Sequence, residues 1–329
     1  MSARGEILET QIKQDAQKIE QVFSEMGRVL VGQSALTKRL MMAMVAGGHV
    51  LLEGLPGLAK TTSIKSLAKV SALSFKRIQF TPDLLPADLI GTQIYDPRTA
   101  EFKVRKGPVF AHLVLADEIN RAPAKVQSAL LEAMEERQVT IGDQSYVLDE
   151  PFLVMATQNP IEQEGTYPLP EAQIDRFLFK LKISYTSPEE EVEIIKRATN
   201  PQDIQLEKVI TRQEIIGLRE TIDKIYVSEK IRHYIVNLVY ATRTPKERGF
   251  KDLAHLIEYG ASPRSSIYLD KVARVNALFE GRSFVTPQDV KDICLDILRH
   301  RVKPTYEAEA ENIKSEDIIT KILDRVDVP

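Results

Sequence analysis

The most informative segment of the chain is Gly54-Leu55-Pro56-Gly57-Leu58-Ala59-Lys60-Thr61. It follows the apolar run His49-Val50-Leu51-Leu52 and precedes a helix-like segment, 61–70, so we predict a strand, a glycine-rich turn and a helix start. Such a turn leaves backbone N–H groups free to bind phosphate oxygens, with the positive end of the helix dipole behind them. Lys60 then reaches the β- and γ-phosphates of a nucleotide, and the Thr61 hydroxyl holds Mg²⁺. Ala59 stands where glycine usually precedes this lysine, and its small side chain still allows the loop to close.

A second segment supplies the carboxylates that such a loop needs. It is His112-Leu113-Val114-Leu115-Ala116-Asp117-Glu118, an apolar strand that ends in two adjacent acids. We expect Asp117 to contact Mg²⁺ through its water shell and Glu118 to polarise the attacking water. A pair of solvated surface carboxylates is the alternative, but buried carboxylates need a cation nearby. The two segments together predict a chain that binds and hydrolyses a nucleoside triphosphate.

Three further polar residues are candidates for the same site. Asn159 ends the strand-like segment Ala156-Thr157-Gln158-Asn159, where it can orient the water, although Asn before Pro also favours a simple turn. Arg264 lies in the first turn of an expected helix, a position that the dipole disfavours for a cation and that suggests an anionic partner. Arg176 and Arg264 can equally be ordinary salt-bridge residues, and spacing alone favours that reading.

The order of elements predicts an α/β core followed by a helical region. Short apolar strands alternate with helices, which indicates a parallel sheet covered on both faces. The expected strands are 49–53, 75–80, 112–117, 152–157 and 177–183, and the expected helices are 60–70, 123–137 and 170–176. Residues 89–109 and 138–150 interrupt the alternation and are predicted to be β-hairpins.

Helices are expected on either side of this core. Residues 6–28 and 34–46 precede it, and a helix begins at Ser187-Pro188. We place the domain boundary near Asn200, which gives an N-terminal helix and nucleotide-binding core at 1–199 and a helical domain at 200–329. In the second domain Thr211 and Glu214 form a capping box. Three further helices are expected there, each directly after a capping residue: 229–243 after Ser228, 263–280 after Ser262 and 287–301 after Thr286.

Composition narrows the class of protein. The chain has 329 residues and a net charge of −3, which allows two domains and argues against a dominant nucleic-acid surface. No apolar run approaches the roughly 20 residues of a membrane span. Cys294 is the only cysteine, so no internal disulfide forms, and a cytoplasmic setting is expected. No histidines lie at metal-ligand spacing, so any metal is expected to be Mg²⁺ brought by the nucleotide.

These motifs, in this order, resemble the MoxR family of AAA+ ATPases, in the clade with an insert in helix 2. The resemblance spans most of residues 20–305. It rests on 53–61, 116–122, 156–160, 169–177 and 260–264, and Ala59 also matches the family. It implies an AAA+ P-loop NTPase core with a parallel five-stranded sheet, followed by an all-α lid domain.

The resemblance also implies roles for individual residues. ATP and Mg²⁺ are the implied cofactors, and Lys60 with Thr61 matches the Walker A motif. Asp117 and Glu118 match Walker B, and Asn159 matches sensor 1. Arg264 matches sensor 2, which reaches the γ-phosphate from the lid, and Arg176 matches the arginine finger, which acts in the neighbouring subunit. The implied nucleotide contacts are Gly32, Gln33, Gly54, Pro56, Gly57, Leu58, Ala59, Lys60, Thr61, Thr62 and Arg264.

The resemblance implies a hexameric ring and a partner with a von Willebrand A domain. The implied work is chaperone-like remodelling, maturation or metal-cofactor insertion of client proteins, with hairpins 89–109 and 138–150 matching the helix-2 and presensor-1 inserts. Three alternatives stay open. A nucleic-acid motor would use the cations of the first hairpin, a magnesium-chelatase-type subunit would serve a cofactor enzyme, and a nucleotide-gated scaffold would signal by assembly. Glu118 and Asn159 argue against pure binding.

Overall fold

The structure is a computed structural model that describes residues 3–54, 58–159, 166–183, 185–199 and 204–329. The chain forms two compact units, which are described separately. One comprises Gln21–Ile216, and the other combines Met1–Glu20 with Gly217–Pro329. Three residues of the expected phosphate loop, Leu55, Pro56 and Gly57, lie outside the described residues.

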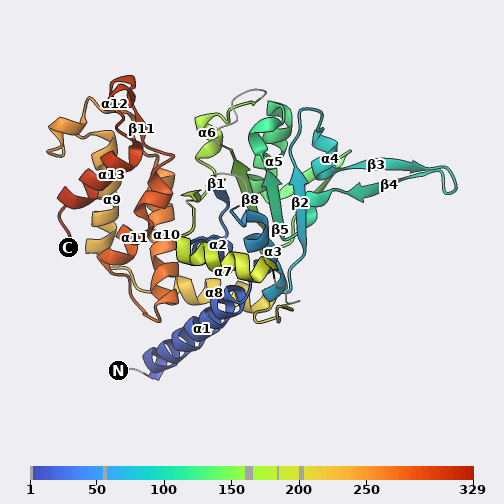
Figure 1. The fold of residues 1–329 in the computed structure, drawn as a ribbon, viewed down its shortest axis with the longest axis horizontal. Coiled ribbons are helices and arrows are strands. Elements are labelled where there is room, and N and C mark those ends of the chain that lie inside the picture. Colours follow the sequence, from blue (N-terminus) through green and yellow to red (C-terminus); the bar gives the residue numbers. More distant parts are fainter. Residues whose placement is uncertain (1–2, 55–57, 160–165, 184, 200–203) are drawn as a thin grey trace. The chain divides into compact units, whose positions relative to one another are not determined.

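A five-stranded parallel sheet forms the centre of the first unit, with strand order β2-β5-β8-β1-β9 (Figure 1). The strands are β1 Val50–Glu53, β2 Phe75–Gln79, β5 Leu113–Asp117, β8 Leu153–Gln158 and β9 Phe179–Lys182. The central strands are almost continuously buried, as expected when helices cover both faces of a parallel sheet. The predicted parallel five-stranded α/β fold is confirmed.

Helices pack on both faces because alternate strand residues point to opposite sides. On one face, residues such as Val114 and Val154 join α5 Ala124–Glu136 in a core that includes Leu130 and Leu131. On the other, α2 Ser34–Ala46 and α3 Lys60–Val70 contact each other and neighbouring strands. Short segments complete this unit: α4 Pro86–Ile90, η1 Pro108–Phe110, η2 Ile119–Arg121, α6 Glu171–Ile174 and α7 Pro188–Thr199.

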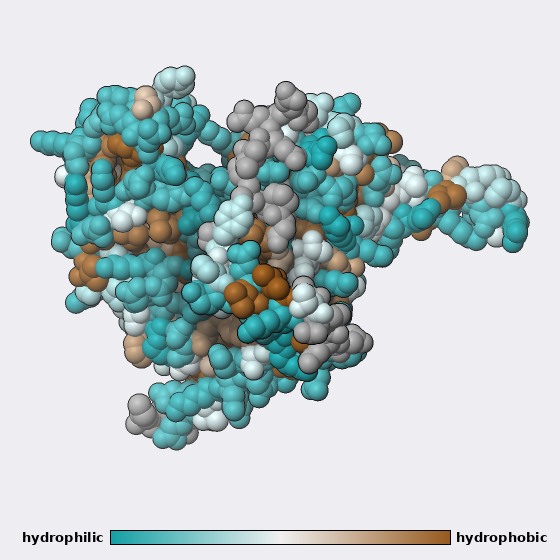
Figure 2. Space-filling model, in the orientation of Figure 1, coloured by the Kyte–Doolittle hydropathy of each residue, from teal (hydrophilic) through white to brown (hydrophobic). Residues whose placement is uncertain are grey.

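Both predicted hairpins are present. The first, β3 Gly91–Asp96 with β4 Glu101–Lys106, extends away from the sheet (Figure 1). The base of this hairpin requires glycine at the first residue of β3, because a Cβ at Gly91 would lie 2.2 Å from the Arg105 carbonyl oxygen. Figure 2 shows this hairpin as mostly hydrophilic with a small hydrophobic area, and its exposed large hydrophobic residues are Ile94, Tyr95 and Phe102. The second hairpin comprises β6 Gln138–Ile141 and β7 Gln144–Val147.

Two cations of the first hairpin, Lys103 and Lys106, contact partners within the same unit. Lys103 Nζ lies 2.6 Å from a carboxylate oxygen of Asp96. Lys106 Nζ lies 4.7 Å from the ring centre of Phe110 and 5.8 Å from that of Tyr146 on the second hairpin. The charge of Lys103 is therefore paired within the hairpin itself.

The second unit is mainly helical, and its helix starts follow the predicted caps. The Ser228 hydroxyl caps α9, and Thr286 forms a capping box with Asp289 at α11. The Thr211 and Glu214 contacts predicted at the start of α8 are also present. The helices are α1 Ala3–Gly27, α8 Arg212–Asp223, α9 Glu229–Arg243, η3 Lys251–Leu253, α10 Pro263–Phe279, α11 Pro287–Leu298, α12 Tyr306–Ala310 and α13 Ser315–Arg325, with α1 and α8 shared between the units.

One expectation for this region differs from the structure in detail. The expected all-α lid contains a small antiparallel sheet, β10 Ile257–Tyr259 with β11 Lys303–Pro304. Strands this short carry no periodic pattern that a sequence could reveal. The domain boundary expected near Asn200 stays a prediction. In the structure the first compact unit continues to Ile216, because the segment before α8 returns to the core of that unit. There the N–H groups of Val209 and Ile210 donate to the Val70 carbonyl.

Within the described residues, none of the helices combines the length and the apolar character needed to cross a membrane.

Candidate active site

The carboxyl ends of three parallel strands meet at one cavity of about 410 Å³. The phosphate-loop segment after β1 lines one side with Gly54, Leu58, Ala59, Lys60, Thr61 and Thr62. The ends of β5 and β8 line another with Asp117, Glu118, Thr157, Gln158 and Asn159, and Arg77 on β2 completes the described lining. Residues far apart in sequence are thus gathered at the edge where parallel α/β sheets bind ligands.

The backbone at Ala59 explains why glycine is usual at this position. Ala59 has φ 54° and ψ 20°, the left-handed conformation, directly before α3. A residue with a Cβ pays about 1–2 kcal/mol for this conformation, and glycine pays almost nothing. Alanine nevertheless adopts this conformation directly before α3.

Lys60 begins α3 and directs its ammonium group back across the loop. Its Nζ donates to the carbonyl oxygen of Gly54. Partial burial lowers the pKa of Lys60 from its usual value, while the charges of Asp117 and Glu118 act in the opposite direction. Because these carboxylates stabilise the charged form, the lysine is a cation placed between the loop and the two acids.

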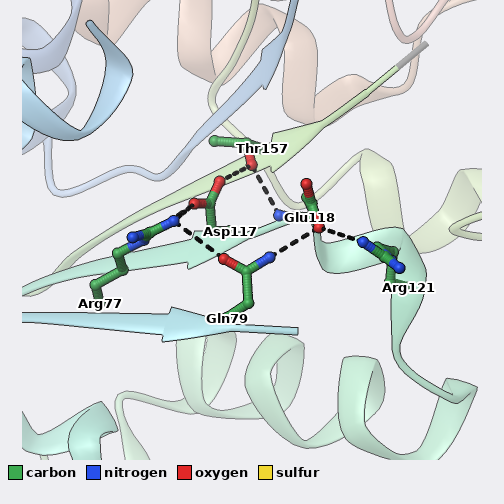
Figure 3. A network of polar contacts seen from close by, with 6 residues as sticks. All are labelled: Arg77, Gln79, Asp117, Glu118, Arg121 and Thr157. Atoms are coloured by element: carbon green, nitrogen blue, oxygen red, sulfur yellow. Dashed lines mark hydrogen bonds and ion pairs between the residues drawn. The ribbon is translucent and has the colours of Figure 1, made fainter. Parts of the chain in front are cut away.

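Thr157 on β8 organises the two carboxylates (Figure 3). Its hydroxyl donates to Asp117 Oδ1 at 2.7 Å and accepts the backbone N–H of Glu118 at 2.8 Å. The register of β5 and β8, which pairs Ala116 with Ala156, brings Thr157 level with Asp117. One buried hydroxyl therefore fixes both acids relative to the sheet.

Glu118 is held in a strained conformation and by two side chains. Its φ is 56° and its ψ is 50°. This left-handed conformation costs free energy in a residue with a side chain, and residues strained in this way cluster at functional sites. Its Oε2 accepts from Gln79 Nε2 at 2.8 Å and from an Arg121 guanidinium nitrogen at 3.0 Å (Figure 3). The carboxylate is thus oriented at the mouth of the cavity.

Asp117 carries a second contact, from Arg77 on the edge strand β2. Arg77 Nε and Nη2 lie 3.0 and 2.6 Å from Asp117 Oδ2. The same Nη2 donates to Gln79 Oε1 at 3.1 Å. Both carboxylate oxygens of Asp117 therefore have donors, and the polar network runs from Thr157 to Glu118 (Figure 3).

The remaining predicted residues are distributed differently. Asn159 lines the cavity, whereas the described lining does not include Gly32, Gln33 or Arg176. Gly32 has φ +70° and packs near Thr186 and Glu190, and the Gln33 carbonyl accepts the Thr37 hydroxyl.

The two candidate arginines lie elsewhere. Arg176 Nη2 lies 2.8 Å from Glu135 Oε2 on α5. Arg264 belongs to the first turn of α10, in the second compact unit. The roles expected for both arginines stay predictions.

Sequence reasoning gave no role to four residues of the network, Arg77, Gln79, Arg121 and Thr157. One signal was present: Arg77 and Gln79 are two apart near the end of an expected strand, so they share a face. Their partners follow from the register of β2 with β5, which pairs Gln79 with Asp117. That pairing spans about forty residues, and no local pattern encodes it.

Comparison with known proteins agrees with this architecture. The ATPase family associated with various cellular activities (AAA) matches residues 49–179, and the AAA lid domain matches residues 251–322. "Chaperone MoxR1" of Mycobacterium tuberculosis is 49% identical over 313 residues, which cover 94% of this chain and 82% of that protein. The uncharacterised protein YeaC of Bacillus subtilis is 45% identical, with 92% of each chain covered.

A solved structure is equally similar. The crystal structure of a candidate ATPase from Cytophaga hutchinsonii has a TM-score of 0.94, 50% identity and full coverage of both chains. The AAA core and the AAA lid are thus matched in one chain, and the relatives match nearly the whole sequence. The chain therefore belongs to the MoxR family of AAA+ ATPases.

Proposed function

We propose that this chain hydrolyses ATP with Mg²⁺ and uses the energy to remodel partner proteins. One observation carries the catalytic half of this proposal. A single cavity brings together the phosphate-loop lysine, the Thr61 hydroxyl, the Asp117 and Glu118 carboxylates and the Asn159 amide. A phosphate-binding turn without a carboxylate pair would support nucleotide binding alone.

The residues present fit a metal-bound nucleotide. Lys60 and the start of α3 provide positive charge for phosphate oxygens, and hydroxyl and carboxylate oxygens are the ligands that Mg²⁺ prefers. Thr61 and Asp117 are the residues that would hold the metal. Bound Mg²⁺ would neutralise charge on the β- and γ-phosphates.

The side chains divide the remaining work. Lys60 binds the phosphates, and Glu118, oriented by Gln79 and Arg121, accepts a hydrogen bond from the attacking water and polarises it. Asn159 orients the same water from the neighbouring strand. Negative charge develops on the phosphoryl group as it is transferred. Among the described residues that line the cavity, Arg77 is the only arginine that could stabilise this charge.

An arginine from a neighbouring copy would supply that charge. We infer that Arg176 acts in trans within a ring, which we take to be a hexamer, and that Arg264 contributes from the lid of the same chain. An arginine added in this way can accelerate phosphoryl transfer by about 10³–10⁵. The relative named as a chaperone supports protein remodelling as the work performed. We further propose that a protein with a von Willebrand A domain is the partner and that metal-cofactor insertion is one form of the remodelling.

ATP turnover measured against protein concentration tests both halves of the proposal. We expect the specific activity of the native chain to rise with concentration. Lys60→Ala should lose nucleotide binding, whereas Glu118→Gln should keep binding and lose about 10²–10⁴ in turnover, because it lacks the base. A Lys60→Ala protein with the native rate would refute the proposed catalytic site.

The proposed action of Arg176 in a neighbouring subunit needs a separate experiment with its own control variant. Arg176→Ala should keep nucleotide binding and lose the concentration-dependent rate. Glu135→Gln removes the carboxylate that Arg176 contacts and retains the arginine, so it should keep most of the rate. Equal loss in the two variants would indicate that Arg176 acts only through its ion pair within one subunit.

A further inference from the structure

Arg77 makes the closest cation contact to the carboxylate that we assign to the metal. Its Nη2 and Nε both donate to Asp117 Oδ2, at 2.6 and 3.0 Å, while Oδ1 accepts from Thr157. The guanidinium also lines the cavity. A positive charge therefore already lies at one oxygen of the carboxylate that would hold the metal.

The sheet places Arg77 there. β2 is an edge strand, and its register with β5 pairs Arg77 with Leu115 and Gln79 with Asp117. Arg77 and Gln79 share a face, so the guanidinium reaches diagonally along the sheet to Asp117 and also donates to Gln79 Oε1 at 3.1 Å. Strand pairing thus builds the contact into the fold.

The two partners differ in their exposure to water. The Arg77 side chain is 50% exposed, whereas that of Asp117 is 18% exposed. The contact of a half-exposed arginine contributes little and breaks easily, because water can solvate the departing guanidinium. Asp117 is less accessible, so its charge still needs a cation when Arg77 leaves.

We propose that Arg77 is a positioning residue that competes with the divalent metal for Asp117 and thereby sets the metal dependence of nucleotide binding. The inference rests on the proposed function, since it assumes that Asp117 serves Mg²⁺ and ATP. Arg77 occupies Asp117 Oδ2 before the metal arrives, and the metal must displace it. Its departure also breaks the contact with Gln79, which holds Glu118, so metal binding is communicated to the second carboxylate.

The test measures binding of a fluorescent, non-hydrolysable ATP analogue while Mg²⁺ is titrated. Arg77→Gln removes the charge, and we expect its half-saturating Mg²⁺ concentration to fall roughly 1.5- to fivefold, the range expected for a partly exposed pair. Arg77→Lys keeps the charge and should stay near the native value. Binding in EDTA should be unchanged or weaker in Arg77→Gln, because a positive charge leaves the cavity.

Lys76→Gln is the matched control. It removes the same charge from the adjacent residue of β2, whose side chain points to the opposite face of the sheet. We expect its Mg²⁺ titration to match that of the native protein. Arg77→Met serves as a second neutral variant should Arg77→Gln fail to fold.

The outcomes distinguish a failure of the proposed function from a failure of the role assigned to Arg77. A native protein whose analogue binding does not depend on Mg²⁺ would overturn the proposed function. A native protein with normal metal dependence, and an Arg77→Gln variant that needs the same or more Mg²⁺, would overturn the role of Arg77 alone. The second result would make Arg77 a phosphate ligand or a purely structural residue.

Discussion

Replacing Thr157 with valine removes a hydroxyl that serves two acids and leaves the shape of the side chain almost unchanged. Thr157 is 2% exposed, so water cannot readily take the place of the lost oxygen. The change leaves the backbone N–H of Glu118 without its acceptor and removes a donor from Asp117 Oδ1. We expect a loss of stability together with misplacement of both carboxylates.

The size of the loss follows from these two contacts. An unsatisfied backbone donor costs about 1–3 kcal/mol, and a hydrogen bond to a charged group contributes about 1.5–3 kcal/mol. Asp117 is 18% exposed and regains part of its solvation, so we expect about 2–4 kcal/mol in total. The compact unit Gln21–Ile216 holds about 200 residues, and at about 2.1 cal/mol/K of unfolding entropy per residue the melting temperature falls by about 5–10 °C.

Thermal unfolding followed by circular dichroism measures this shift. Thr157→Ser keeps the oxygen and loses only a methyl group, so its melting temperature should fall by less than half as much. ATP turnover by Thr157→Val should fall further than nucleotide binding, because Glu118 loses its backbone anchor. A valine variant that melts within about 1 °C of the native protein would refute the role that we assign to the hydroxyl.

Three other predictions concern stability. Ala59→Gly relieves the left-handed conformation at φ 54° and should raise the free energy of unfolding by about 1 kcal/mol without loss of nucleotide binding; a lower urea midpoint would contradict this. Burial lowers the pKa of His49 to about 3, so stability should fall as pH drops below 6.5, by about 2 kcal/mol at pH 5, and a His49→Gln variant should lose this part of the pH dependence. Arg282→Met leaves the Asp289 carboxylate, 1% exposed, without the guanidinium that contacts both its oxygens, and chemical unfolding should show a loss of about 3–5 kcal/mol.

Local sequence patterns predicted the phosphate-loop region well because its structure is encoded within a few residues. An apolar run, a turn and a helix former follow one another, and the strand and helix appear at Val50–Glu53 and Lys60–Val70. The caps at Ser228 and Thr286 were likewise readable, since each depends on a side chain and a backbone N–H three residues later.

The rest of the site depends on strand register, which local patterns do not contain. Thr157 was visible as part of a strand, but its contacts with Asp117 and Glu118 arise only when β8 pairs with β5. Arg77 and Gln79 similarly acquire partners through β2, an edge strand whose exposed residues carry no apolar signal. Contacts between residues on neighbouring strands therefore depend on the strand register, and the buried hydrophobic residues set that register.

Arg176 shows how a residue proposed to act on a neighbouring subunit appears within one chain. Its guanidinium lies 2.8 Å from the Glu135 carboxylate, and both side chains are about one-third exposed, at 32% and 36%. Ion pairs at such exposure contribute about 0.2–1 kcal/mol, so exchange of Glu135 for a nucleotide phosphate in a ring would cost little. By contrast, Arg282 contacts a carboxylate that is 1% exposed, and breaking that pair would leave a buried charge. A weak ion pair with Glu135 suits the proposed role of Arg176, because such a pair keeps the arginine in position and still releases it to a neighbouring subunit.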